Sequence, residues 1–331
     1  MDPVLVEVTR GRLVESAHRG AAVVMDATGG VVFEAGDIDA GIYPRSAVKA
    51  LLALPMVESG AADRLGLTDA EIALACSSHS GEAMHVQGAS AMLAKAGRCV
   101  SSLECGSHWP GNAAATHALA ASGGQPTALH NNCSGKHSGF VCLACDRGDD
   151  PAGYVAPDHP TMRVVTAALA EMTGTVLDGR NLAVDGCSIP TYAVPLRALA
   201  LAFARFGSGE GLHADRASAA RRIRAAVAAN PMMVAGTDRF DTRLMSLLGD
   251  AVFSKGGAEG VFCAALPMLG LGIAVKCDDG AGRAAEVAMA ALVRRFLKPE
   301  ADLTGFVNPV LRNWNAIAVG ELRATAVLTP I

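Results

Sequence analysis

The fold of this chain is decided by the stretch Tyr43-Pro44-Arg45-Ser46-Ala47-Val48-Lys49 and the apolar run Ala50-Leu51-Leu52-Ala53-Leu54 that follows it. Proline suits the first turn of a helix, so a helix is predicted to run on from Pro44. Ser46 and Lys49 then lie three residues apart on one helix face, where their side chains can touch. The run is apolar on all sides, which predicts burial, and burial lowers the pKa of a lysine. The pair therefore has the composition of a nucleophile with its own base.

Two further motifs strengthen this interpretation, because Ser-x-x-Lys alone is frequent and most such lysines project into solvent. The first is the polar loop Cys76-Ser77-Ser78-His79-Ser80-Gly81-Glu82, which follows an apolar segment. The second is Lys255-Gly256-Gly257 in a predicted late hairpin. It resembles the Lys-Thr-Gly strand of serine β-lactamases and penicillin-binding proteins, and the three motifs come in the same order. Gly256 departs from that form, since it lacks a hydroxyl that could orient an acidic group.

The alternation of residue types predicts an α+β fold. Short β-branched runs predict strands over 4–35, and helical spacing dominates from about 45 to 235. Strands then return near 251–254, 260–265 and 272–276, followed by an amphipathic helix over 283–297. We expect strands from both ends of the chain to pair into one antiparallel sheet. The prediction is a single domain of two subdomains, a sheet part over 1–44 and 240–331 and a helical part over 45–239.

Composition excludes several classes of protein. The 331 residues are enough to bury a stable core without disulfides or metal ions. The net charge is −4 and the sequence has no cluster of basic residues interleaved with aromatic ones, so no nucleic-acid partner is expected. No uncharged apolar run reaches the length of a membrane span, and the first residues do not resemble a signal peptide. The nine cysteines are an odd number and are spread along the chain, which is a poor pattern for disulfides and suits reduced thiols in a cytoplasmic protein.

Five ordered blocks together resemble the rhizobial-type (class 3) L-asparaginases, over about residues 5 to 325. They are the Arg45 to Lys49 segment with Leu54-Pro55-Met56-Val57-Glu58-Ser59-Gly60, the Cys76 to Glu82 loop, the segment from His130 to Gly139, Asp185-Gly186-Cys187-Ser188-Ile189-Pro190, and Lys255 to Gly260. The resemblance implies a serine-β-lactamase-like fold, hydrolysis of L-asparagine to L-aspartate and ammonia, and a homodimer.

The resemblance also implies roles for particular residues. Two serine–lysine tandems map onto Ser46 with Lys49 and Ser78 with Lys255. We assign attack on the amide to Ser46, activated by Lys49, and a proton relay to the leaving ammonia to Ser78 and Lys255. The sequence by itself leaves open which serine attacks.

A zinc ion is the cofactor that the resemblance implies, held by Cys133, Lys136 and Cys187 and completed by water. Thiolates are ordinary zinc ligands, whereas a lysine must first become neutral. The alternative is two buried free thiols and a surface lysine. We expect such a zinc ion to support positioning and affinity, because the serine–lysine pairs already supply a nucleophile and a base.

An amino-acid substrate needs one cation and one anion in its pocket, and Arg45 and Asp185 are the candidates. Each can equally form a structural salt bridge. His137, with His79, lies in a motif loop and is a candidate hydrogen-bond donor, although a lone histidine is more often structural.

Three other functions stay open at this point. The first is a glutaminase, a β-lactamase or a D-alanyl peptidase of the same fold. Glutamine is the hardest substrate to separate from asparagine, because the one methylene between them gives only about 1–3 kcal/mol of discrimination. The second is a binding protein that keeps the pocket without catalysis, and retention of both lysines and both serines speaks against it. The third is a metallohydrolase in which zinc-bound water attacks directly.

Overall fold

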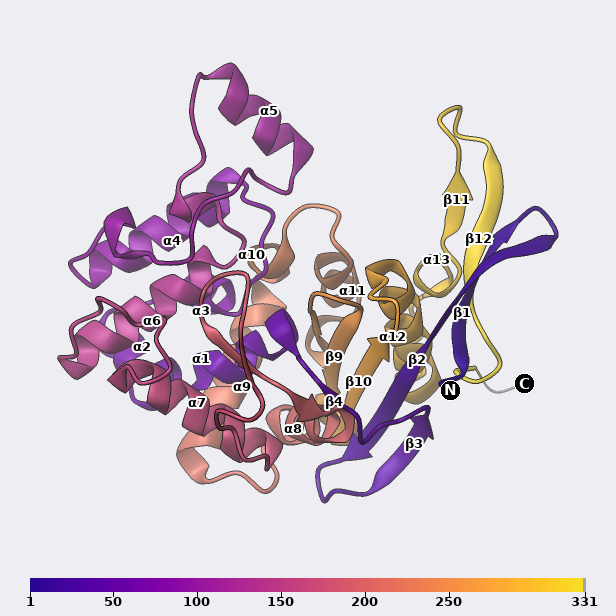
Figure 1. The fold of residues 1–331 in the computed structure, drawn as a ribbon, viewed down its shortest axis with the longest axis horizontal. Coiled ribbons are helices and arrows are strands. Elements are labelled where there is room, and N and C mark those ends of the chain that lie inside the picture. Colours follow the sequence, from indigo (N-terminus) through magenta and orange to yellow (C-terminus); the bar gives the residue numbers. More distant parts are fainter. Residues whose placement is uncertain (330–331) are drawn as a thin grey trace. The chain divides into compact units, whose positions relative to one another are not determined.

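The computed structural model describes residues 1–329 and has the predicted α+β class. The chain forms two compact units, shown in Figure 1 with colours that follow the sequence. The sheet unit comprises Met1–Ala47, Ala193–Gly211 and Ala251–Ile331, and the helical unit comprises Val48–Tyr192 and Leu212–Asp250. The segment Ala193–Gly211, grouped with the helical part in the sequence analysis, lies in the sheet unit because its helix packs on the sheet.

The sheet unit is built on an antiparallel sheet of eight strands, in the order β11-β12-β1-β2-β10-β9-β8 with β3 paired to β2. The strands are β1 (Val4–Arg10), β2 (Leu13–Asp26), β3 (Val31–Ala35), β8 (Phe253–Gly256), β9 (Val261–Leu266), β10 (Leu271–Cys277), β11 (Val310–Arg312) and β12 (Ala318–Ala324). Strand β2 joins the two ends of the chain, because Ala22 pairs with Val275 of β10. The predicted pairing of N-terminal and C-terminal strands is therefore confirmed.

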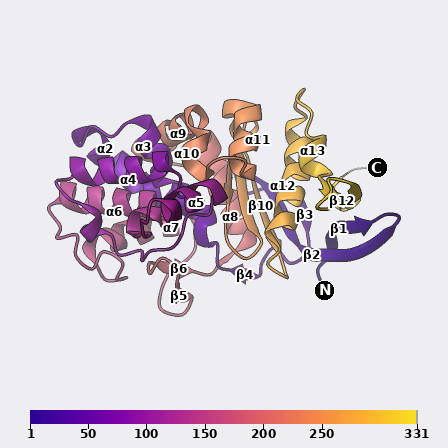
Figure 2. The ribbon, with the colours of Figure 1, turned by 90° about the horizontal axis from the view of Figure 1, so that it is seen from above.

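Two helices cover the faces of this sheet (Figure 2). Helix α8 (Leu196–Ser208) approaches β10 so closely that a Cβ on Gly272 would lie 2.0 Å from the carbonyl oxygen of Ala200. Helix α12 (Gly282–Leu297) contacts β9 and β10, and its residues 287–293 are all buried. The short helix α13 (Thr304–Val307) contacts α12. These contacts bury the centre of the sheet on both sides.

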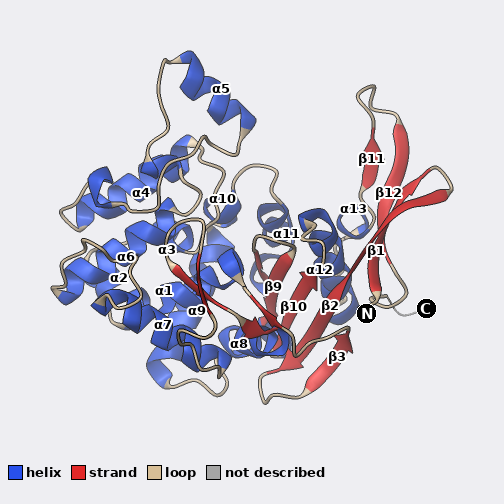
Figure 3. Cartoon of the chain, in the orientation of Figure 1, coloured by secondary structure: helices blue, strands red, loops and turns tan. Residues whose placement is uncertain are grey.

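The outer part of the sheet consists of the β1–β2 and β11–β12 hairpins, which extend as two arms in Figure 3. Strands β11 and β12 were not predicted, because their sequence is short and only one strand residue, Leu322, is buried. β12 is held to β1 by backbone pairing and by an ion pair between Arg323 and Glu7 at 2.8 Å. The β11–β12 turn exposes Trp314.

The helical unit packs around α1 (Lys49–Glu58), of which all residues from Lys49 to Val57 are buried. α1 contacts α2, α3, α6, α7 and α9. The other helices of this unit are α2 (Ala61–Arg64), α3 (Asp69–Ala75), α4 (Ala83–Lys95), α5 (Ala113–Ala121), α6 (Ser134–Arg147), α7 (Pro160–Thr173), α9 (Ala214–Ala229), α10 (Pro231–Ala235) and α11 (Phe240–Leu248). A two-stranded hairpin, β5 (Leu182–Val184) and β6 (Pro190–Tyr192), completes it.

No helix within residues 1–329 combines the length and the apolar character that crossing a membrane requires.

Candidate active site

The helical unit contains a cluster of buried polar side chains around Lys49, the first residue of α1. Lys49 is 1% exposed, and its Nζ lies 2.9 Å from Ser78 Oγ and 3.1 Å from Cys133 Sγ. Nζ also donates to the carbonyl oxygen of Ser77. Burial lowers the pKa of Lys49, which favours the neutral amine that can accept a proton. A buried amine beside a hydroxyl has the geometry of a proton-transfer pair.

Ser78 lies in the loop between α3 and α4, which several backbone contacts hold in place. The Ser78 N–H donates to Val234 O at 2.9 Å, and the His79 N–H donates to Asn132 O at 3.1 Å. The His79 ring accepts from the Gly81 N–H through Nδ1, so its Nε2 carries the hydrogen that reaches Ser134 Oγ at 2.9 Å. His79 is thus a structural residue that fixes this loop.

Cys133 and Lys136 come from the start of α6, which the sequence brings close to α3. A Cβ on Gly135 would lie 2.3 Å from the carbonyl oxygen of Leu74, so only glycine allows the two helices this approach. Lys136 is buried, and its Nζ lies 2.9 Å from Cys187 Sγ. The predicted zinc ligands therefore lie together, and the alternative of a surface lysine is wrong.

Charge balance governs this group of two thiols and two amines. The pKa of Cys133 lies well below its ordinary value, because the Cys187 thiol donates to it and the charges of Lys49 and Lys136 favour its thiolate. Burial alone disfavours a charge on Lys136, but the sulfur atoms of Cys133 and Cys187 outweigh it and raise the pKa of Lys136. The cluster is a buried network in which each charge has a partner.

Cys187 and Asp185 lie in the tight turn between β5 and β6. The Asp185 N–H donates to Ile189 O at 2.9 Å, and Ser188 has a φ of +77°, which lets the turn close. The Asp185 carboxylate accepts from the Gly186 N–H at 2.8 Å and is mostly buried. The turn brings the Cys187 thiol toward α6 and leaves Asp185 in the same buried region.

His137 lies beside Lys136 in α6 and is completely buried. Its Nδ1 lies 2.6 Å from the hydroxyl of Tyr154, a residue that the sequence analysis did not single out. Burial, with the nearby charges of Lys136 and Lys49, holds the pKa of His137 well below its ordinary value, so the ring is neutral at pH 7. The Gly- and Pro-containing loop before Tyr154 gave no signal that its ring turns inward.

Ser46, Arg45 and Lys255 belong to the sheet unit. Arg45 and Ser46 lie in the 3-10 helix η1 (Arg45–Val48), and Arg45 has a φ of +50°, a strained conformation for a residue with a side chain. Lys255 is buried in β8, and its Nζ donates to Gly256 O at 2.6 Å. A Cβ on Gly257 would lie 2.8 Å from Pro44 O, so the strand end after Lys255 lies against the turn that carries Ser46.

A family model described as L-asparaginase II matches residues 6–324, which is nearly the whole chain. The chain belongs to the L-asparaginase II family. Membership of this family supports an amidohydrolase that acts on a small amino-acid amide. No curated protein sequence matches this L-asparaginase II family member.

Solved structures with some likeness in fold include two of a protein called Mglu. The structure described as "Crystal Structure Analysis of Mglu in its native form" is 17% identical, has a TM-score of 0.40, and is matched over 95% of this chain and 74% of that chain. "Crystal Structure Analysis of Mglu" is 17% identical with a TM-score of 0.35, over 81% of this chain and 64% of that chain. The asparaginase II chain thus spans less than two thirds of the latter, and likeness at this level carries no statement about its substrate.

The donor set of this asparaginase II family member is compatible with a zinc ion. Within residues 1–329 no three histidine, cysteine, aspartate or glutamate side chains form a metal site. The predicted zinc ligands are a different kind of group, because they combine Lys136 with two cysteines. Of the two cysteines, Cys133 already favours its thiolate form. Two sulfurs and one amine nitrogen are donors that zinc accepts once the amine has lost its proton.

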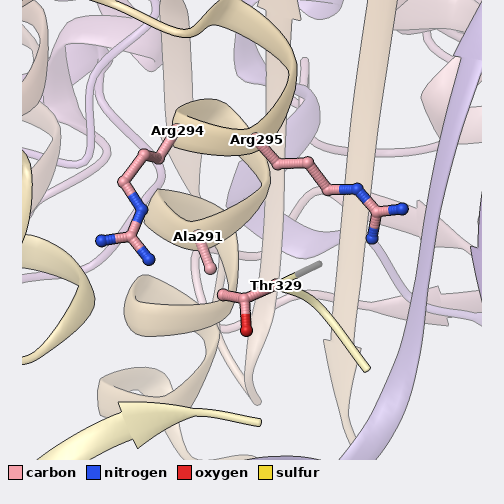
Figure 4. Close-up of a pocket in the computed structure, with 4 residues that line it drawn as sticks. All are labelled: Ala291, Arg294, Arg295 and Thr329. Atoms are coloured by element: carbon pink, nitrogen blue, oxygen red, sulfur yellow. The ribbon is translucent and has the colours of Figure 1, made fainter. Parts of the chain in front are cut away.

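A cavity of about 300 Å³ in the sheet unit is a separate feature. It is lined by Ala291, Arg294, Arg295 and Thr329, and the two arginine side chains point away from one another in Figure 4. The Arg295 guanidinium stacks 4.6 Å from the centroid of the Phe33 ring. The arginines therefore do not converge on a common anion.

Proposed function

We propose that the protein is an L-asparaginase that hydrolyses L-asparagine to L-aspartate and ammonia through a serine–lysine mechanism, on a fold of the serine-β-lactamase type. The observation that carries this proposal is the buried Lys49 amine at 2.9 Å from Ser78 Oγ. A buried lysine is costly, and this one lies against the Ser78 hydroxyl and the Cys133 sulfur. Its retention fits a role in proton transfer.

In the proposed reaction Ser46 attacks the side-chain amide carbon while its proton passes to Lys49. The proton then moves through the Ser78 hydroxyl to the amide nitrogen, so the C–N bond breaks and ammonia leaves. The resulting ester on Ser46 is hydrolysed by water, which returns a proton along the same route and frees L-aspartate. The contact between Lys49 and Ser78 supports this relay, because each proton transfer needs its two atoms within hydrogen-bond distance.

Recognition of the substrate is assigned to Arg45, Asp185 and His137. An α-carboxylate is matched by the guanidinium of Arg45, and an α-ammonium group by the carboxylate of Asp185. Asp185 lies in the turn that also carries Cys187, so substrate recognition and the thiol cluster share one structural element. Lys255 shares with Ser78 the relay of a proton to the leaving ammonia.

Zinc, when bound, would be held by Cys133, Lys136 and Cys187. It would supply positive charge that favours substrate binding and would fix the β5–β6 turn against the start of α6. Lys136 would have to release its proton on binding, so affinity would rise with pH. The base remains Lys49, whose contact with Cys133 couples it to the same cluster.

The decisive experiment measures ammonia release from asparagine, glutamine and other amides by the wild type, Ser46→Ala and Ser78→Ala. Ser122→Ala, at an exposed position, is the matched control. We expect release from asparagine that both site variants lose and the control keeps, with an acyl adduct mapped to Ser46 by mass spectrometry. Equal activity in all four proteins would overturn the serine mechanism, and preferential release from glutamine would replace the substrate. An adduct on Ser78 would exchange the roles of the two serines.

A further inference from the structure

The side chain of Tyr154 is fully buried and makes two hydrogen bonds through one oxygen atom. The Glu104 N–H donates to the phenol at 2.9 Å, and His137 Nδ1 lies 2.6 Å away. The two rings meet edge to face, with centroids 5.4 Å apart. The position of the His137 ring is thus set by Tyr154 through both contact and hydrogen bonding.

The hydrogen-bond pattern also selects which ring nitrogen of His137 carries the hydrogen. If the phenol donates to Nδ1, Nε2 carries the hydrogen, and one buried donor is left unpaired. If Nδ1 donates instead, the phenol hydrogen and the Nε2 lone pair are both left unpaired. Burying an unpaired polar group is unfavourable, so the first arrangement is preferred.

The Nε2 atom of His137 is buried and has no hydrogen-bond partner within residues 1–329. It belongs to a ring that lies near Lys136 and Lys49, close enough to sense both charges. Most buried donors in proteins are paired, so an unpaired one calls for an acceptor from outside the chain. An oxygen atom of an amino-acid substrate has the required chemistry.

We propose that Tyr154 is a positioning residue, which fixes His137 as the Nε2–H tautomer so that Nε2 donates to an oxygen of the bound substrate. The proposal deepens the proposed function and rests on it for the identity of that substrate. Tyr154 itself does not touch the reacting atoms. Its effect passes through the orientation and tautomer of one histidine.

The test is Tyr154→Phe, which removes the hydroxyl and keeps the ring. Tyr192→Phe is the matched control, because Tyr192 is also a buried tyrosine of the helical unit. We expect Tyr154→Phe to raise KM for asparagine about tenfold with kcat nearly unchanged, since a hydrogen bond made equally to substrate and transition state acts on KM. The control should change neither constant. A fall in kcat and thermal stability together, with KM unchanged, would assign Tyr154 to folding alone and overturn the proposal.

A second readout is the long-range proton–nitrogen NMR spectrum of histidine-labelled protein, with His137 assigned from its absence in His137→Gln. We expect the Nε2–H pattern in the wild type and a mixture of tautomers in Tyr154→Phe. An Nδ1–H pattern in the wild type would overturn the proposal.

Added L-aspartate separates this proposal from the proposed function. We expect it to shift the Nε2–H resonance of His137 in the wild type, and an unmoved resonance would reject the substrate contact. If the wild type releases ammonia from no amide, the proposed function fails, while the tautomer and its response to L-aspartate still decide the role of Tyr154.

Discussion

The cores of the two units bury different kinds of side chain. In the sheet unit, helix α12 and strands β9 and β10 bury a largely apolar set of residues. The helical unit buries two lysines, Lys49 and Lys136, and three histidines, His79, His85 and His137. Apolar burial stabilises a fold, whereas a buried polar network is close to neutral or costly. Under the proposed function, the comparison teaches that the helical unit gives up stability for chemistry. The sheet unit also buries a lysine, Lys255, at the strand end beside the turn that carries Ser46.

The largest expected effect comes from Lys49→Met, which keeps the volume and removes the base. We expect kcat/KM for asparagine to fall about 10³-fold, because a positioned base contributes about 10² to 10⁴. The free energy of unfolding should fall as well, because the Cys133 sulfur and the Ser77 carbonyl oxygen lose the buried amine that faces them. Ammonia release and urea denaturation measure the two quantities.

The control for this variant is Lys95→Met, a partly exposed lysine of the same unit that pairs with Glu71. It should leave kcat/KM unchanged. If Lys49→Met kept its activity, the contrast between the two cores would have no functional meaning.

A smaller effect is expected from Leu292→Ala in α12, whose side chain is completely buried. The free energy of unfolding should fall by about 2–5 kcal/mol, the usual cost of such a cavity. The folded fraction should keep its kcat/KM, as measured well below the melting temperature. Lost activity without lost stability would show that α12 acts on the chemistry.

Gly135→Ala tests the close approach of α6 to α3. The added Cβ would meet Leu74 O at 2.3 Å, so the backbone must shift, at a cost of about 1–3 kcal/mol in stability. The shift should also weaken zinc binding, measured by competition with a chelator, because Cys133 and Lys136 flank this glycine. Gly282→Ala is the control, since its Cβ would meet nothing within 4 Å and should raise stability slightly. Equal stability of the two variants would contradict the predicted clash.

The smallest effect is a pH dependence at Glu82. Burial acts to raise its pKa, but hydrogen bonds from Ser80 and Thr237 outweigh it and lower the pKa below the ordinary 4.5. This stabilisation is fully present above pH 4.5 and is lost as the pH falls through the lower value in the folded protein. Glu82→Gln should therefore be less stable than the wild type by about 1 kcal/mol at pH 7, with the gap closing in acid. A gap that persists at low pH would assign the effect to packing.

Much of this fold could be predicted, because strong local patterns coincided with buried elements. The helix over 283–297 is α12 within one residue, and the runs near 260–265 and 272–276 are β9 and β10. Strands β11 and β12 escaped prediction because only Leu322 among their residues is buried, so their sequence shows no alternation. Their pairing with β1 depends on backbone contacts made across the whole chain.

The candidate site was predictable only where a motif carried it. Lys49 was named from its spacing to Ser46 and Ser78 from the family resemblance, and the structure brings Lys49 and Ser78 together. Lys136 could not be distinguished from a surface lysine by composition, because its burial depends on Gly135 and the distant Cys187. Tyr154 was missed for the same reason, since its contact with His137 joins two segments that share no motif.

The sheet unit is assembled from three separate stretches of chain, and this has a consequence during synthesis. Strand β2 is among the first segments to leave the ribosome, yet its partner β10 follows about 250 residues later. At about 5–20 residues per second the wait is roughly 10 to 50 s. Throughout it, one edge of an apolar strand has no partner, and such an edge is where nascent chains associate. The central sheet can therefore close only after the C-terminal strands have left the ribosome. A ribosome stalled before residue 271 would hold a chain whose unpaired strand edge chaperones must shield.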